Sequence, residues 1–388
     1  MTLKSYDTNY FGKERNKMPA RKHTQWLAEP SIEYVDSRIY SDWGIFNQEQ
    51  EKIFKKCWIP LCHESELENH LDFRSSSIAG SKVAMIRDKD RIVAVEHNFQ
   101  SMPVSGNLAS DGGYDHWNCP SLPCEVKFGG MVWVTLNSKP TQDVEGWAAG
   151  AFDVIRSSLD TEPLEVFHYH KAIIDSNYKL WHDTNSEFYH DYMHYFNRVT
   201  GFNDEYFSRK CTGFDNGHVN VGSFEVQYGE FELGESREEL SFPDLPPNQW
   251  YMIDLFPGMN FNLRGSALRS DVVTPLGPNK VMIEFRGFGL KKDTPEERKT
   301  RINHHNTIWG PMGRNLHEDL LGISGQGASM SPGQEHRHIL HGRHEDETIH
   351  DEIGMRHFYD EWSNWMGIDP KNPMRENAVW ENREDAYV

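Results

Sequence analysis

The order of two apolar patterns along the chain is the feature that most constrains its fold. Between residues 58 and 136, short runs of β-branched and aromatic residues alternate with Gly, Asp and Asn turn signals, which is typical of a small antiparallel β domain. A helix is expected before them, at 41–57, because its apolar residues fall on one stripe. The expected strands of this β domain are 58–62, 82–87, 91–96 and 131–136.

The pattern changes near residue 160. Residues 164–171 predict a strand that leads into a helix over about 178–196. A long β region and further helices follow, with strands expected at 250–256, 260–263, 271–274 and 281–289 and helices at 294–322 and 350–366. Because strands and helices are grouped rather than alternating, the chain predicts an α+β fold. We divide it into an N-terminal arm (1–40), a small β domain (41–160) and a larger domain (161–388).

Charge and composition narrow the class of protein. With 40 Lys and Arg against 59 Asp and Glu, the net charge of −19 disfavours nucleic acid or an anionic membrane as a partner. The N-terminus lacks the apolar stretch of a secretory signal, and no apolar run is long enough to cross a membrane, so we expect a cytoplasmic protein. Five cysteines in 388 residues do not form a disulfide framework, whereas 20 histidines make a metal site worth seeking.

The strongest chemical signal is the segment from Glu187 to His194. Glu187, His190 and His194 are spaced i, i+3 and i+7, which places them on one face of the predicted helix. Two imidazoles and a carboxylate with open positions are typical of non-haem Fe(II) oxygenases, although zinc uses the same ligand types. A zinc protease is disfavoured because no Glu directly follows His190. Hydrogen-bonded, half-buried histidines are the alternative without a metal.

Four segments, taken together, resemble the large subunits of Rieske non-haem iron oxygenases. Residues 39–67 (IYSDWGIFNQEQEKIFKKCWIPLCHESEL) are similar to that family's N-terminal region, and 177–190 (NYKLWHDTNSEFYH) to its catalytic helix. Residues 309–313 (WGPMG), followed by Glu318 and Asp319, resemble its Gly-Pro-x-Gly…Asp-Asp segment, and 356–362 (RHFYDEW) its closing helix. The resemblance runs from about residue 35 to 370 in the family's order.

The resemblance implies a Rieske-like antiparallel β domain followed by a helix-grip (START-like) catalytic domain with a long antiparallel sheet and flanking helices. It implies that His190, His194 and Asp319 hold a mononuclear Fe(II), with O2 and a small organic, possibly aromatic, substrate at the open positions. Glu187 would hydrogen-bond a ligand histidine and bridge to the cluster of the adjacent subunit in a trimer. By resemblance, the residues lining the pocket are Asp183, Phe196, Asn197, Phe261 and Phe285.

The Rieske cluster ligands, however, depart from the family pattern. A [2Fe–2S] Rieske centre takes two thiolates and two imidazoles, from Cys-x-His and Cys-x-x-His. The first pair of positions falls on Gln100 and Met102; in the second pair Cys119 remains, but Leu122 replaces the histidine. We therefore expect no [2Fe–2S] cluster in this chain. Electrons would come from a Rieske-bearing sister subunit, or from a ferredoxin and reductase, through Glu187, in a trimer-based homo- or hetero-oligomer.

Other departures affect the site itself. The family's Glu-Asn pair is His182-Asp183 here, so Asp183 is a possible acid or extra ligand, and the ligand histidines are one or two residues closer than usual. Cys62, His63 and Cys124 are weak candidates for rebuilding a cluster. A last group of histidines is expected to be solvated rather than to form a second metal cluster: His304, His305, His336, His338, His341 and His344.

Two other functions stay open on the sequence alone. A hydrolase or lyase could use the same metal as a Lewis acid, with Asp183 as a general base. The chain could also be a non-catalytic sister subunit of an oxygenase complex. The sequence leaves open whether the metal is iron or zinc, which substrate is oxidised, and whether one or two oxygen atoms are added.

Overall fold

A large antiparallel sheet organises the computed structural model of this protein. The structure describes residues 34–97, 104–109, 119–187, 189–194, 209, 211–225, 240–246, 249–330, 338–340 and 353–368. The sheet has the strand order β10-β16-β15-β14-β13-β12-β11. Its strands are β10 (Leu164–Ile174), β16 (Lys280–Leu290), β15 (Ala267–Gly277), β14 (Met259–Arg264), β13 (Gln249–Leu255), β12 (His218–Glu225) and β11 (Cys211–Phe214).

Two smaller antiparallel sheets precede it. One has the order β2-β9-β8 and the other β6-β3-β4-β5-β7. Their strands are β2 (Ile59–His63), β3 (Asp72–Ile78), β4 (Ser81–Asp88), β5 (Arg91–Glu96), β6 (Ser105–Asn107), β7 (Ser121–Leu122), β8 (Cys124–Lys127) and β9 (Met131–Val134). A further two-stranded pair joins β1 (Tyr34–Asp36) to β17 (His338–Leu340). The predicted α+β class is confirmed.

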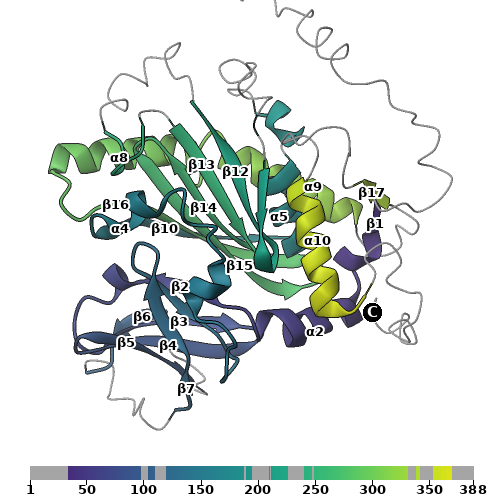
Figure 1. Ribbon diagram of the computed structural model, residues 1–388, viewed down its shortest axis with the longest axis horizontal. Helices are drawn as coiled ribbons and strands as arrows, with labels where there is room; N and C mark the ends of the chain where they lie inside the picture. Colours follow the sequence, from purple (N-terminus) through teal and green to yellow (C-terminus); the bar gives the residue numbers. More distant parts are fainter. Residues whose placement is uncertain are drawn as a thin grey trace, which may run out of the picture.

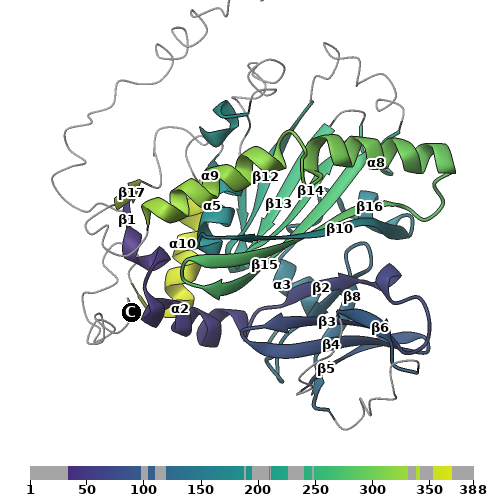
Figure 2. The same ribbon diagram turned by 180° about the vertical axis from the view of Figure 1, so that it is seen from behind.

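The helices are grouped around the large sheet. They are α2 (Trp43–Glu49), α3 (Val144–Ala148), α4 (Arg156–Asp160), α5 (Tyr178–Glu187), α8 (Pro295–Trp309), α9 (Leu316–Ser329) and α10 (Ile353–Met366). In Figures 1 and 2 the small sheets lie below the large sheet, and α8 and α9 run across its upper side. Among the described residues, no helix is long and apolar enough to cross a membrane.

The helix predicted over 178–196 is too long. It ends at Glu187, and a 3-10 turn (Tyr189–Tyr192) follows. There, His190 O accepts from Met193 N at 2.6 Å and Asp191 O accepts from His194 N at 3.2 Å, which are i to i+3 bonds. Aromatic, His and Asp residues favour the helix only weakly, so little opposes this tightening. The prediction that Glu187, His190 and His194 share one helical face is therefore wrong.

Strand register divides the side chains of the large sheet between two faces. Directly paired residues lie on one face, as do alternate residues along a strand. The face that we call the helix face carries one cross-strand row of paired residues: Asp254, Asn260, Asp271, Phe285 and His170. The Trp181 ring of α5 lies 5.7 Å from the Phe285 ring on this face.

The opposite face, the domain face, packs against the small sheets. The Phe261 ring lies 6.4 Å from that of Trp133 in β9. Arg286 Nε donates to Glu66 Oε1 at 2.8 Å, and Arg286 Nη2 donates to Leu61 O at 2.9 Å. Because Trp133 and Arg286 are both buried, apolar packing and a buried ion pair together hold the small sheets on this face.

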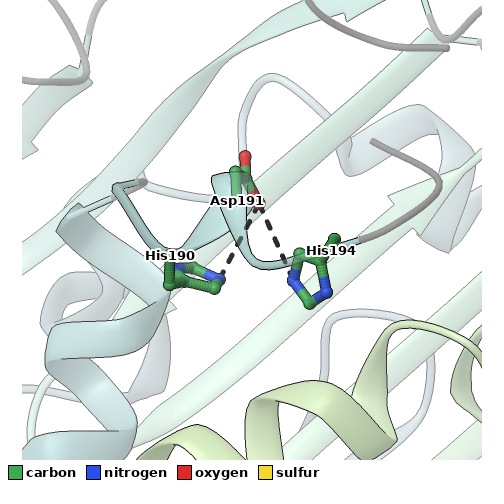
Figure 3. Close-up of side chains that lie close together, drawn as sticks. All are labelled: His190, Asp191 and His194. Carbon is green, nitrogen blue, oxygen red and sulfur yellow. Dashed lines mark ion pairs between the residues drawn. The ribbon is translucent and has the colours of Figure 1, made fainter. Parts of the chain in front are cut away.

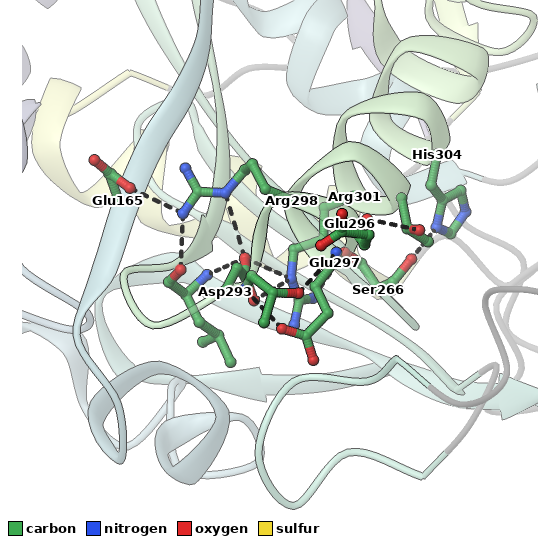
Figure 4. A network of polar contacts seen from close by, with 11 residues as sticks. Glu165, Ser266, Asp293, Glu296, Glu297, Arg298, Arg301 and His304 are labelled. Atoms are coloured by element: carbon green, nitrogen blue, oxygen red, sulfur yellow. Dashed lines mark hydrogen bonds and ion pairs between the residues drawn. The ribbon is translucent and has the colours of Figure 1, made fainter.

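A polar network fixes α8 to the large sheet (Figure 4). Thr294 and Glu297 form a capping box at the start of the helix. Asp293 accepts from Arg301 Nε at 2.9 Å, and Arg301 Nη1 donates to Ser266 O at 3.0 Å. The start of α8 is thereby tied to β15, which sets the position of the rest of the helix over the helix face.

Buried polar contacts join α5 to α2, from the first part of the sequence, and to α10, from its last part. Lys179 Nζ donates to Glu49 Oε1 at 2.6 Å, and both side chains are fully buried. Trp362 Nε1 of α10 donates to the same carboxylate oxygen at 2.8 Å. Glu49 is the last residue of α2, so its buried carboxylate joins α2, α5 and α10. These contacts fix the position of α5, after which the segment with His190 and His194 follows.

Candidate metal centre

Two imidazoles and a carboxylate from distant parts of the chain converge just beyond α5. His190 lies in the 3-10 turn and His194 two residues after it, while Asp319 lies in the first turn of α9. Asp319 Oδ1 is 2.9 Å from His194 Nε2 and 3.5 Å from His190 Nε2. The three residues that resemblance singled out therefore meet with their potential ligand atoms facing one another.

A second carboxylate, Asp191, lies beside the same two imidazoles (Figure 3). Its Oδ1 atom is 3.8 Å from His190 Nε2 and 3.9 Å from His194 Nε2. The potential ligand atoms of Asp191, His190 and His194 all lie within 4.8 Å of one another. The sequence analysis did not predict Asp191 as a ligand. Its position between the two histidines could have indicated it, but on the predicted continuous helix Asp191 would point away from the face with His190 and His194.

The polar surroundings orient His194. Its ring is 3% exposed, and its Nδ1 lies 2.6 Å from Glu318 Oε2. A carboxylate on Nδ1 fixes the tautomer that leaves Nε2 as a metal ligand. Burial alone would lower the pKa of His194, but the adjacent Asp319 carboxylate outweighs it and raises that pKa. From the sequence, Glu318 was identified only as part of the Glu-Asp motif, and its contact with His194 was not predicted.

The arrangement fits a divalent cation. Asp319 Oδ1 is buried and has no well-aligned hydrogen bond among the described residues, although two imidazole nitrogens lie within 3.5 Å of it. Close approach without hydrogen-bond alignment is expected of atoms that surround a cation. Imidazole nitrogens bind such metals at about 2.0–2.1 Å, and two histidines with one carboxylate suit non-haem iron.

Asp183 lies in a different environment. Its carboxylate accepts from Tyr40 at 2.9 Å and from Tyr359 at 3.1 Å, and all three side chains are buried. Burial raises the pKa of Asp183 to about 7, against the opposing effects of His182 and the two tyrosine hydroxyls. The hydrogen bonds described for Asp183 thus join α5 to the N-terminal segment and α10, rather than to the three clustered residues.

The expected pocket residues are divided between the two faces of the sheet. Phe285 lies on the helix face, as a pocket residue should. Phe261 lies on the domain face, with its ring 5.0 Å from that of Phe152, so the prediction that it lines the pocket is wrong. On β14 every residue is buried, so burial alone could not tell the two faces apart. Phe196, Asn197 and the Glu187 side chain lie outside the described residues.

Three of the remaining histidines, His182, His304 and His305, are buried. His182 forms an ion pair with Asp254 and stacks on Phe358 at 3.9 Å. His304 Nδ1 lies 2.7 Å from Ser266 Oγ, and the His305 ring is fully buried. The prediction that His304 and His305 are solvated is therefore wrong, because they lie on the inner side of α8. The side chains of His336, His338, His341 and His344 lie outside the described residues.

The small sheets hold the remaining cysteine candidates. Cys119 is half-buried, and Leu122 lies in β7, whereas Gln100 and Met102 lie outside the described residues. Burial raises the pKa of the Cys124 thiol to about 12 and that of Cys62 well above its usual range. Iron–sulfur clusters bind thiolates, so neither environment favours a ligand. Burial also lowers the pKa of His63 to about 4, and its Nε2 contacts Gly129 O.

Comparison with known proteins gives consistent matches. A family model described as the catalytic domain of ring-hydroxylating alpha subunits matches residues 161–368. The chain is 57% identical to the methanesulfonate monooxygenase hydroxylase subunit alpha of Methylosulfonomonas methylovora, over 92% of this chain and 97% of that protein. It is 31% identical to the 2-aminobenzenesulfonate 2,3-dioxygenase subunit alpha of Alcaligenes sp, over 87% of this chain and 94% of that protein. The structure of the naphthalene 1,2-dioxygenase of Rhodococcus sp. has a similar fold, with a TM-score of 0.67 and 17% sequence identity, over 86% of this chain and 94% of that chain.

Proposed function

Because this chain belongs to the ring-hydroxylating alpha subunits, a family of oxygenases, we propose that it is the hydroxylase subunit of an oxygenase that acts on a small organosulfonate. The 57% identity over nearly the whole of a methanesulfonate monooxygenase subunit carries this proposal. The 2-aminobenzenesulfonate enzyme supports it, since the substrates named for the two relatives share a sulfonate group. The substrate class thus proposed is narrower than the small organic, possibly aromatic, class expected from the sequence.

We propose that His190, His194 and Asp319 hold a mononuclear Fe(II). Two observations support this ligand set: the three side chains converge, and the buried Asp319 Oδ1 has no well-aligned hydrogen bond among the described residues. Iron bound there would supply the O2-dependent redox chemistry of the reaction. The chain itself contributes geometry: Glu318 holds the Nδ1 side of His194, so the Nε2 lone pair stays directed toward Asp319 and His190.

We propose further that the N-terminal β domain carries no [2Fe–2S] cluster. Gln100, Met102 and Leu122 stand where the family has ligands, and Cys62 and Cys124 have raised thiol pKa values.

Electrons then come from outside the chain. We propose a Rieske-bearing sister subunit, or a ferredoxin with its reductase, that delivers electrons through Glu187 in a trimer-based oligomer. Glu187 is the last residue of α5 and lies three residues before His190 in the chain, and this proximity in sequence supports the proposed route. The division into an arm (1–40), a β domain (41–160) and a catalytic domain (161–388) belongs to the same proposal, and the family match starting at residue 161 supports its last boundary.

Asp183 fits a positioning role better than a catalytic one. Its two tyrosine hydrogen bonds hold α5 against the N-terminal segment and α10. A non-redox hydrolase with Asp183 as general base would need that carboxylate to reach the substrate. The iron oxygenase therefore remains our main proposal, and zinc as the bound metal is an outcome that the metal analysis below can return.

Reconstitution tests the proposed function. The iron-loaded chain, combined with a Rieske-bearing partner and its reductase, should consume O2 and NADH when methanesulfonate is added. His190→Ala and Asp319→Ala should lose iron and at least about 99% of this activity, because each removes a proposed ligand. Lys280→Ala, at an exposed position on β16, is the matched control and should keep both. Activity that persists in both ligand variants would contradict the site assignment.

A further inference from the structure

Several polar atoms on the helix face are buried without hydrogen-bond partners. In the described part of the chain, neither amide atom of Asn260 has a partner, nor does either ring nitrogen of His305. The same holds for Arg269 Nη1 and His170 Nε2. Asn260 and His305 are fully buried, and Arg269 is 2% exposed. Natural proteins leave few such groups, because each buried polar atom without a partner is destabilising, so a concentration on one surface indicates a missing ligand.

Ring contacts connect His305, Arg269 and His170 into one cluster, and Asn260 lies opposite Asp271, the ion-pair partner of Arg269. The Arg269 guanidinium lies 4.8 Å from the Trp309 ring centre, and the His305 and Trp309 rings are 6.0 Å apart. The His170 ring stacks on Phe285 at 4.7 Å, and Arg269 lies 5.6 Å from the Phe285 ring centre. The cluster therefore joins the end of α8 to the start of β15 and the middle of β16 and β10.

The cluster lies on the part of the helix face that contacts α5. Ser186 Oγ, four residues before His190 in the chain, donates to Asp254 Oδ2 at 3.0 Å. Asp254, Asn260 and Asp271 are neighbours in one cross-strand row, and Arg269 is two residues from Asp271 on the same strand and face. The unpartnered groups thus lie in and beside the row that contacts the end of α5, from which the segment with His190 continues.

The Arg269 side chain is held in position for binding. Its Nε and Nη2 atoms contact the Asp271 carboxylate at 2.7 and 2.8 Å, which leaves Nη1 as the end that faces away from the ion pair. The flat side of the guanidinium lies over Trp309. A guanidinium fixed by a carboxylate and an aromatic ring offers its remaining N–H groups in one direction, and this suits a tetrahedral or planar oxyanion.

The imidazoles beside Arg269 are neutral donors and acceptors. Burial lowers the pKa of His170 to about 4 and that of His305 well below its usual range, with Arg269 among the further causes. Gly287 admits the His305 ring to the sheet surface, since a Cβ there would lie 2.5 Å from His305 Cε1. His305 therefore lies directly on the helix face, where a hydrogen bond from a neutral N–H can reach a ligand.

From this geometry we propose that Arg269, Asn260 and His305 bind the anionic sulfonate oxygens of the substrate, with its carbon end directed to the candidate metal centre. The assignment rests on the proposed sulfonate oxygenase function and adds the residues that recognise the anion. A small, charged headgroup also explains why this face is polar rather than lined by apolar side chains alone.

Binding to the full-length, metal-stripped chain tests this proposal without depending on activity. Isothermal titration with methanesulfonate should give a measurable Kd, and dimethyl sulfone, which replaces one sulfonate oxygen by a methyl group and carries no charge, should bind much more weakly. Arg269→Gln should weaken methanesulfonate binding on the order of tenfold to a hundredfold, as expected for a lost hydrogen bond to a charged group. Its effect on dimethyl sulfone should be small.

Asn260→Leu separates binding from structure. Because the Asn260 amide has no hydrogen-bond partner among the residues that the structure describes, its replacement should leave the melting temperature unchanged or raised, while methanesulfonate binding weakens by about threefold or more. If Arg269→Gln alone fails to fold, the double variant Arg269→Gln/Asp271→Asn removes both charges of the buried pair and serves in its place.

The outcomes distinguish the two proposals. If the unmodified chain binds methanesulfonate and the Arg269 and Asn260 variants bind it equally well, the anion site is wrong while the sulfonate function stands. If the unmodified chain binds neither methanesulfonate nor 2-aminobenzenesulfonate, both the anion site and the sulfonate function are overturned. Weakened binding in both variants with an unchanged melting temperature for Asn260→Leu supports the site.

Discussion

At the scale of single residues, the proposed metal centre depends on Asp319, which is 125 positions after His194 in the sequence. Spacing could predict that His190 and His194 act together, but only the resemblance of 309–319 to a family motif pointed to Asp319. Spacing also assumed a continuous helix, and so missed Asp191. The Glu318 contact with His194 Nδ1 requires the position of α9 over α5, which no local pattern contains.

Glu318 gives the first prediction at this scale. Glu318→Ala should weaken iron binding by about tenfold to a hundredfold, because the carboxylate on Nδ1 orients a ligand histidine and increases its basicity. Competition with a coloured chelator measures this affinity. Glu296→Ala, in the first turn of α8, is the matched control. Equal iron affinity in the Glu318 variant and the unmodified chain would show that this contact does not support the site.

Asp183 gives a prediction on pH. Its folded pKa of about 7 lies above the unfolded value of about 4, so the native state holds a proton more tightly. This contribution to the free energy of unfolding is complete below about pH 4 and is lost as the pH rises toward about 7, by about 1.4 kcal/mol per unit of pKa difference.

The variant Asp183→Asn removes this titration while keeping acceptors for Tyr40 and Tyr359. Urea unfolding between pH 4 and 7 should therefore show a stability that falls less with rising pH in the variant than in the unmodified chain. Parallel pH profiles for the two proteins would mean that Asp183 titrates normally.

At the scale of secondary structure elements, strands with apolar runs were predicted well and polar ones were not. The strands β5 and β16 coincide with predicted runs to within a residue or so, whereas β3 (DFRSSSI) was missed. Its three serines carry no apolar alternation, and it becomes a strand through pairing with β4 and β6. Tertiary pairing of this kind overrides local propensity.

The buried Glu49–Lys179 pair gives a prediction for the attachment of α5. Glu49→Ala should reduce the free energy of unfolding by about 3–5 kcal/mol, because it leaves the Lys179 ammonium buried without its carboxylate. Chemical unfolding measures this loss. The double variant Glu49→Leu/Lys179→Met removes both charges and should recover much of it. A Glu49→Ala variant as stable as the unmodified chain would show that the pair does not anchor α5.

At the scale of the whole molecule, side-chain contacts hold the small sheets on the large one. Phe261, Trp133 and the Arg286–Glu66 ion pair form a buried interface between them. Because none of these contacts involves a cluster, the interface is compatible with the proposed loss of the cluster ligands. Fold class and domain order were readable from patterns, but the faces of the large sheet were not.

The separation of the iron centre from the electron source is the central claim for the molecule as a whole. The iron and acid-labile sulfide content of the full-length chain, isolated without oxygen, tests it most directly. We predict about one iron per chain and no acid-labile sulfide, because in our proposal His190, His194 and Asp319 hold one ion, and Gln100, Met102 and Leu122 stand at three of the positions that resemblance assigns to the cluster ligands. About three irons with two sulfides per chain, or zinc in place of iron, would contradict the account.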